Sequence, residues 1–84
     1  MAQNGEDDFE GEWELPNGVK VQTGRIYECV YNGKPRVGIL KAMRPVKGGT
    51  GLVFFVGELS HESDDPKDWK TFNENGIRDI RELV

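Results

Sequence analysis

Cysteine is almost absent from this chain of 84 residues: Cys29 is the only one, and His61 is the only histidine. A single thiol excludes an internal disulfide and a zinc site built from four thiolates. This cysteine usage fits a reducing compartment, so we expect a cytoplasmic protein. No apolar run approaches the ~20 residues that a membrane span needs, and the acidic N-terminus lacks the apolar segment of a signal peptide. We therefore expect no membrane partner.

Residues that would support catalysis are equally scarce. A Cys–His pair can carry acyl chemistry, but Cys29 and His61 fall in a predicted strand and a predicted loop, without an orienting third group. The acidic residues of 62–68 do not have the spacing of a calcium loop. The glycine-rich stretch 48–51 precedes a strand instead of a helix, which leaves at most a backbone anion nest beside Lys47. We expect no enzyme, no metal and no cofactor.

Charge is present in quantity and is unevenly distributed. Residues 1–14 carry six acids and no base, residues 20–47 carry seven bases and only Glu28 as an acid, and residues 58–68 are acidic again. The net charge of −4 therefore hides a basic middle between two acidic segments. Residues 1–11 contain Phe9 as their one aromatic residue and little other apolar surface, so we predict that they form a disordered acidic arm.

The remaining chain has closely spaced turn residues, as is typical of a β protein. Gly and Asn-Gly turns separate short pieces rich in Val, Ile, Tyr and Phe, which is typical of close-spaced strands. We predict strands at about 12–15, 19–22, 25–31, 36–43, 52–59 and 69–72, with boundaries good to a few residues. The stretch 51–57 is apolar on both faces, which favours the central strand. The run 77–83 suits a short helical turn or an irregular strand.

Asn32-Gly33 is the best-defined turn, because both residues tolerate the positive φ of a two-residue type I′ hairpin. Such a turn pairs Tyr31 with Lys34, Cys29 with Arg36, Tyr27 with Gly38 and Ile26 with Ile39. We assign Ile26, Val30, Val37 and Ile39 to the core face. The opposite face then carries Arg25, Tyr27, Tyr31, Lys34 and Arg36 as an aromatic and basic surface.

A sheet this small must protect its edges, and closure does so. We therefore predict a mainly β fold for residues 12–84, a single small barrel of the SH3-like type with five to six short antiparallel strands. A half-open sheet with one terminal helical turn is the alternative.

Residues 27–80 resemble the WYL domain, an SH3-like or Sm-like barrel found in bacterial regulators. The resemblance is carried by Tyr31 before a hairpin, the basic Lys34–Arg36, Arg44-Pro45, and the closing run Asp68-Trp69-Lys70-Thr71-Phe72 with Ile77. Phe54-Phe55-Val56 stands where that family has its name-giving tripeptide, and Asn73 stands where it has an arginine. The resemblance implies a regulatory, ligand-sensing role.

Bases interleaved with aromatic residues on a small barrel are typical of surfaces that bind single-stranded nucleic acid, where cations follow phosphates and rings stack on bases. We predict a non-enzymatic binding module for single-stranded nucleic acid or a nucleotide-type ligand. Its candidate binding residues are Arg25, Tyr27, Tyr31, Lys34, Arg36, Lys41 and Arg44.

Two alternatives remain open for this surface. The same bases also serve simply to keep a strand pair in solution while the tyrosines cap the core. The small size and acidic arm equally favour a protein-binding adaptor or inhibitor, of a phage-type or other accessory kind, that docks on a larger complex. An exposed edge strand in so short a sheet also favours a homodimer.

Overall fold

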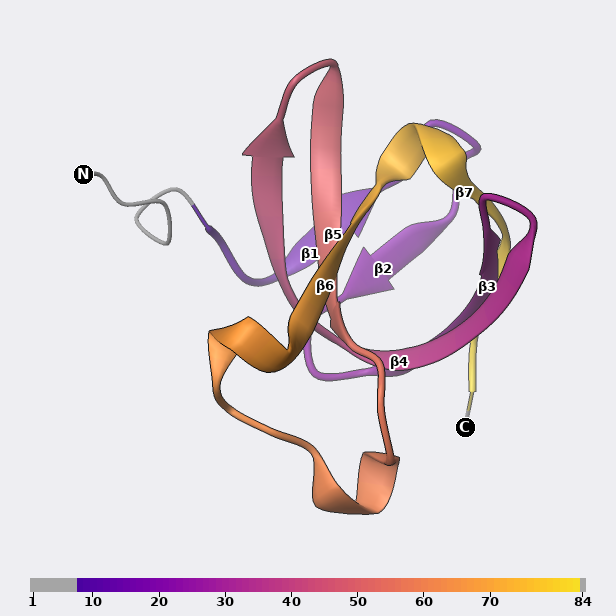
Figure 1. Cartoon of the computed structure of the whole chain (residues 1–84). Coiled ribbons are helices and arrows are strands. Elements are labelled where there is room, and N and C mark those ends of the chain that lie inside the picture. Colours follow the sequence, from indigo (N-terminus) through magenta and orange to yellow (C-terminus); the bar gives the residue numbers. More distant parts are fainter. Residues whose placement is uncertain (1–7, 84) are drawn as a thin grey trace.

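The computed structural model describes residues 8–83, which form seven strands and three short 3-10 helices (Figure 1). The strands are β1 (Glu12–Glu14), β2 (Lys20–Gln22), β3 (Ile26–Tyr31), β4 (Lys34–Val46), β5 (Gly49–Phe55), β6 (Trp69–Asn73) and β7 (Ile77–Glu82). The 3-10 helices are η2 (Leu59–His61), η3 (Pro66–Asp68) and η4 (Glu74–Gly76). The six predicted strands are confirmed, although β4 is longer than expected and β5 ends sooner. The chain after residue 76 is a strand, and the helical turn lies before it.

The strands form a two-stranded antiparallel sheet of β1 and β2 and a five-stranded antiparallel sheet in the order β6-β5-β4-β3-β7. Residues Thr50–Phe55 of β5 are buried on both faces, as the sequence predicts. The central position is nevertheless wrong, because β4 and not β5 lies in the middle. A long strand can occupy the middle of a small sheet by pairing at one end with β3 and at the other with β5.

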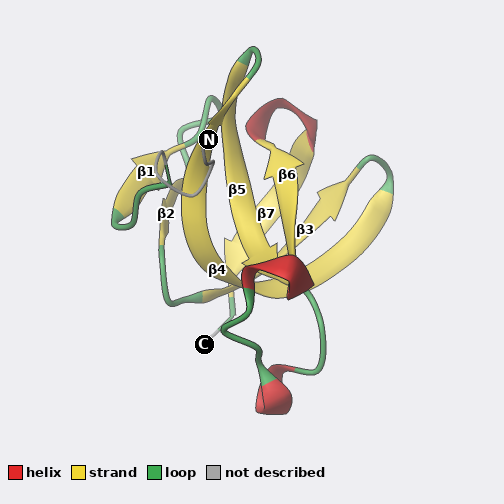
Figure 2. Ribbon diagram, turned by 60° about the vertical axis from the view of Figure 1, so that its left-hand side comes forward, coloured by secondary structure: helices red, strands yellow, loops and turns green. Residues whose placement is uncertain are grey.

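The five-stranded sheet is strongly curved. β4 bends round the molecule, with a shift in register between Leu40 and Ala42 of the kind that a β-bulge produces (Figures 1 and 2). The two edge strands, β6 and β7, are joined by only the three residues of η4, so the edges come together there. Within residues 8–83 no backbone pairing joins β6 to β7, and the sheet order is open.

The core lies on the concave side of this sheet. Leu40, Met43, Leu52 and Phe54 are almost entirely buried, and Phe54 packs on Phe72 with ring centroids 5.4 Å apart. The β1–β2 hairpin covers the core with other buried residues, among them Leu15 and Val21. The Trp13 indole N–H donates to Glu74 over 3.0 Å, which links this hairpin to η4.

The predicted register of the β3–β4 hairpin is confirmed, but the assignment of its faces is wrong. The four predicted pairs are all present. The buried face, however, carries Tyr27 at 3% exposure and Cys29 at 6%, while Val37 is 40% exposed; of the four residues predicted for the core, only Ile39 is buried, at 8%. The curvature decides this, because a ring as large as that of Tyr27 fills the concave side, and the Gln22 backbone N–H donates to its hydroxyl over 2.8 Å.

The prediction of disorder for residues 1–11 is wrong for residues 8–11. Residues 1–7 of that prediction lie outside the described residues. From Asp8 onward the chain is part of the domain: Phe9 and Met43 exchange backbone hydrogen bonds of 2.9 and 2.8 Å, and the Thr23 N–H donates to the Gly11 carbonyl. Phe9 also packs edge-to-face on Trp13, which gives this lone aromatic residue the burial that its sequence context did not suggest.

The segment between β5 and β6 is exposed, as expected of an acidic loop with Pro66, and contains η2 and η3. In residues 8–83, no helix has the length and apolar character needed to cross a membrane.

Candidate ligand-binding surface

The seven predicted binding residues do not form one surface. They divide into tyrosines packed on the core, cations paired with carboxylates, and cations that have no carboxylate within 4 Å in the described part of the chain. The first group is Tyr27 and Tyr31, the second is Arg25, Lys41 and Arg44, and the third is Lys34 and Arg36.

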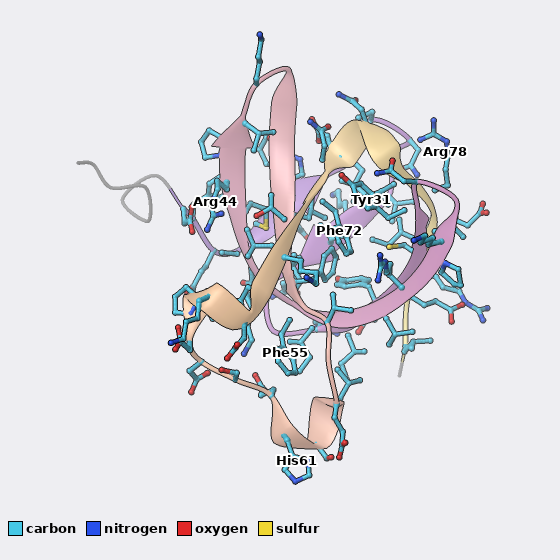
Figure 3. The ribbon with its side chains drawn as sticks, viewed as in Figure 1. Tyr31, Arg44, Phe55, His61, Phe72 and Arg78 are labelled. Atoms are coloured by element: carbon cyan, nitrogen blue, oxygen red, sulfur yellow. The ribbon has the colours of Figure 1, made fainter. Side chains whose placement is uncertain are left out.

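Neither tyrosine presents an open ring. Tyr27 is in the core, so its prediction as a surface residue is wrong. Tyr31 is half-buried, stacks on Phe72 with centroids 4.4 Å apart, and accepts a hydrogen bond from the Asn73 N–H over 3.2 Å. Figure 3 shows Tyr31 and Phe72 side by side inside the curved sheet. Tyr31 is therefore a wall of the concave side and not a free stacking platform.

Arg25 and Arg44 have carboxylate partners from distant parts of the chain. Arg25 precedes β3 and donates to Glu82 of β7 over 2.8 Å. Arg44 holds Asp8 through two hydrogen bonds of 2.8 and 2.9 Å and donates a third, of 3.1 Å, to Thr71. The hydrogen bond to the carboxylate raises the pKa of each guanidinium above its ordinary value. These carboxylates compensate the charge of each arginine and occupy part of its donor set, which weakens its attraction for another anion.

Lys41 is likewise engaged. Its ammonium group pairs with Glu62, lies 3.6 Å from Asp64, and sits 5.7 Å from the centre of the Trp69 ring. The Lys41 side chain is only 12% exposed as a result. Trp69 is the residue of this region that sequence reasoning missed, since it was considered only as part of the closing run 68–72 and not as a candidate binding residue. Its position opposite Phe55 on the outer face of the sheet became predictable only with the β5–β6 register.

Lys34 and Arg36 remain, and they share the face of the β3–β4 hairpin that carries Tyr31. We call Tyr31, Lys34 and Arg36 the hairpin-end cluster. Lys34 is exposed, and Arg36 is half-buried. The Nε of Arg36 is fully buried and has no acceptor in residues 8–83. Burying an unpaired N–H costs ~1–3 kcal/mol, and this atom is the one buried side-chain nitrogen or oxygen without a hydrogen-bond partner in the described structure.

A cavity of about 220 Å³ adjoins Arg36. It is lined by Glu28, Cys29, Val30, Pro35, Arg36, Val37 and Asp79. Glu28 already pairs with Arg81, so its charge is compensated. Glu28, Val30, Pro35 and Val37 lie on the hairpin face opposite the one that Arg36 shares with Tyr31, so the cavity opens mainly on that opposite face, and Asp79 adds a second carboxylate to it.

Cys29 and His61 do not form a reactive pair. Cys29 is buried in β3, and burial raises the pKa of its thiol, although the nearby Arg36 charge acts in the opposite direction. His61 is exposed in η2 and contacts its loop neighbours Glu58 and Ser60. Figure 3 shows His61 at the tip of the loop, far from the hairpin end. In residues 8–83 no group of three or more His, Cys, Asp or Glu side chains is placed to hold a metal ion.

Comparison with family models, with curated proteins and with solved structures found no match to this chain.

Proposed function

We propose that this protein is a small non-enzymatic binding module with a regulatory role, and that it binds a phosphate-bearing ligand, single-stranded nucleic acid or a nucleotide, at the hairpin-end cluster. The single observation that carries the proposal is the state of Arg36. Among residues 8–83 this guanidinium has no carboxylate partner, and its buried Nε–H has no acceptor. A ligand with two oxygens in one plane suits the planar donor fork of an arginine.

The neighbours of Arg36 support the same chemistry. Lys34 lies two residues away on the same face and offers a second, exposed cation. Arg25, Lys41 and Arg44 are weaker candidates, because each already holds a carboxylate. The proposal therefore reduces the predicted site from seven residues to Tyr31, Lys34 and Arg36, with Tyr31 as a positioning residue.

For the fold we propose an SH3-like small barrel of the WYL type. The support is a five-strand order in which a 3-10 turn joins the two edge strands. The resemblance of residues 27–80 favours the same family and a ligand-sensing role.

The test is a fluorescence-anisotropy titration of labelled single-stranded DNA, single-stranded RNA and a labelled nucleotide at low and high salt. We expect affinity that falls with salt, with a slope of about 0.7 per phosphate contacted in a single strand. Arg36→Gln should abolish or strongly weaken binding. Arg25→Gln is the matched control, since it removes the same charge from a paired and exposed arginine.

Equal losses in Arg36→Gln and Arg25→Gln would mean that only net charge matters and would contradict the proposed site. Absence of binding to all three probes by the folded wild-type chain would contradict the proposed function.

A second candidate is a protein-binding adaptor, and one observation favours it. The convex face of the β3–β4 hairpin carries Val37 at 40% exposure, beside exposed Pro35 and half-buried Ile26 and Val30. Val37 is the one large apolar residue exposed in the described chain. For this candidate a partner recovered from lysate must be lost with Val37→Glu and retained with the charge-matched Gln22→Glu on the exposed part of β2.

A further inference from the structure

The outer face of the sheet, opposite the core, gathers cations and an aromatic ring from two strands that are not neighbours. Arg44 of β4 reaches across β5 to Thr71 of β6, and Lys41 of β4 reaches the ring of Trp69 in β6. Gly51 of β5 leaves the space for this crossing, since a Cβ there would lie 2.4 Å from the Thr71 methyl group. We call Lys41, Arg44, Trp69 and Thr71 the outer strip.

Both cations of the outer strip are covered by carboxylates that come from elsewhere in the chain. Asp8, from the N-terminal segment, holds Arg44. Glu62 and Asp64, from the loop between β5 and β6, hold Lys41. Lys41 is the buried partner at 12% exposure, whereas the Glu62 side chain is 44% exposed and that of Asp64 is fully exposed. The acids therefore lie over the cation and are the partners that solvent reaches.

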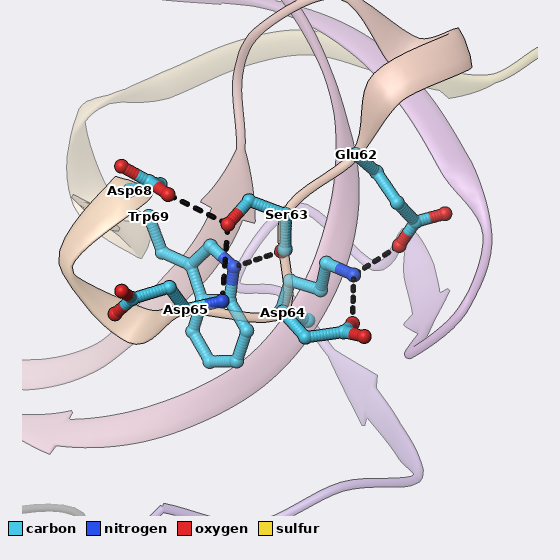
Figure 4. A network of polar contacts seen from close by, with 7 residues as sticks. Glu62, Ser63, Asp64, Asp65, Asp68 and Trp69 are labelled. Atoms are coloured by element: carbon cyan, nitrogen blue, oxygen red, sulfur yellow. Dashed lines mark hydrogen bonds and ion pairs between the residues drawn. The ribbon is translucent and has the colours of Figure 1, made fainter.

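The loop has internal contacts of its own, which Figure 4 shows. The Trp69 indole N–H donates to the Ser63 carbonyl over 2.8 Å, and the Ser63 hydroxyl donates to Asp68 over 2.6 Å. Ser63 thus keeps the loop close to Trp69, while Glu62 and Asp64 on either side of it reach Lys41. The loop therefore contacts the Trp69 ring and also places two carboxylates beside the Lys41 ammonium group.

We propose that the outer strip is a second binding site for the phosphates of single-stranded nucleic acid, and that Glu62 and Asp64 occupy it as internal competitors. The inference rests on the proposed function for the chemistry of the ligand. Ion pairs with exposed partners are weak and screened by salt, so a strand that brings several phosphates displaces two exposed carboxylates. Displacement exposes Lys41 and Trp69 together, a cation beside a ring on which a base packs.

The experiment compares the double variant Glu62→Gln/Asp64→Asn with Glu12→Gln/Glu14→Gln, which removes the same two charges from exposed positions of β1. Anisotropy titration with a labelled oligothymidine is the readout. We expect the first variant to bind more tightly than the control variant, with a salt slope steeper by about 0.7 for each phosphate newly contacted. Lys41→Gln added to the first variant should remove this gain.

Acrylamide quenching gives a readout that needs no ligand. In a Trp13→Phe background Trp69 is the only tryptophan, and Glu62→Gln/Asp64→Asn should increase its quenching as the loop opens. Unchanged quenching, or oligothymidine affinity equal to that of the Glu12→Gln/Glu14→Gln control, overturns the inference. If Arg36→Gln still abolishes wild-type binding in that case, the proposed function stands without it. Binding that appears only in Glu62→Gln/Asp64→Asn supports the outer strip and contradicts the hairpin-end cluster.

Discussion

At the scale of single residues, Gly51 sets how closely β4 and β6 approach over β5. A Cβ at this position would lie 2.4 Å from the Thr71 methyl group and 3.0 Å from a Val46 methyl group. Gly51→Ala should therefore destabilise the protein by about 1–3 kcal/mol through overpacking, seen as a lower urea midpoint. Thr71→Ser removes the closer methyl group and keeps the hydroxyl that accepts from Arg44. The double variant should be more stable than Gly51→Ala alone, and additive losses would contradict this account.

The thiol of Cys29 gives a pH prediction at the same scale. Burial raises its pKa in the folded state, so folding favours the neutral thiol. The resulting stability is fully present below the ordinary thiol pKa and is lost as pH rises through the raised value. The difference in unfolding free energy between wild type and Cys29→Ala should shrink over that alkaline range, as measured by urea titration. A constant difference would contradict the assignment.

Arg36 opposes this shift, because its charge stabilises the thiolate. Arg36→Gln should therefore slow alkylation of Cys29 by iodoacetamide at mildly alkaline pH. Arg25→Gln should leave the rate unchanged, since Arg25 contributes nothing to the Cys29 pKa. This comparison reports on the position of Arg36 whether or not a ligand binds there.

At the scale of elements, turn chemistry was readable from the sequence and curvature was not. Asn32 and Gly33 have φ values of 52° and 82°, as the two central residues of a type I′ turn require, and this set the register of β3 on β4 correctly. Both faces of that hairpin carry apolar residues, so alternation alone did not say which face is concave. The faces were decided by β6 and β7, which come from the far end of the chain and place Phe72 and Ile77 against the tyrosine side.

The observation that the tyrosine face of the β3–β4 hairpin is buried can be tested by measuring unfolding free energies. Leu40→Ala removes a completely buried side chain of β4 and should cost about 2–5 kcal/mol. Val37→Ser, three residues earlier in the same strand, replaces an exposed valine and should change stability by less than about 0.5 kcal/mol. Chemical denaturation measures both. The opposite ranking would restore the core face with Val37 that the sequence analysis predicted.

At the scale of the whole molecule, the charge pattern was visible in the sequence but its pairing was not. The acidic segments and the basic middle are correctly separated along the chain. Folding then brings Asp8 to Arg44, and Glu62 to Lys41, across 36 and 21 residues. Such pairing depends on tertiary geometry, which is why a basic surface of seven residues was predicted and only Lys34 and Arg36 remain without a carboxylate in residues 8–83.

The edges of the sheet determine whether two copies pair. In antiparallel β6 the N–H groups of Trp69, Thr71 and Asn73 point away from β5. That of Trp69 donates to the Pro66 carbonyl, and that of Asn73 donates to the Tyr31 hydroxyl. Only the Thr71 N–H of this set lacks a protein partner in the described structure, so β6 offers a poor template for another strand. Within the five-stranded sheet, an edge-strand homodimer would therefore form through β7.

Even β7 is interrupted, because its register against β3 shifts and Asp79 has a φ of 55°. We therefore expect a monomer at micromolar concentration in light scattering coupled to size exclusion. If the protein is a dimer, Arg81→Pro would be uninformative: the Leu83 N–H donates to the Ile26 carbonyl, so the alternating Arg81 N–H also points toward β3. Glu82→Pro instead alters an exposed position whose N–H points away from β3. A dimer that persists in Glu82→Pro would show that association does not use the β7 edge and would direct attention to the convex face around Val37.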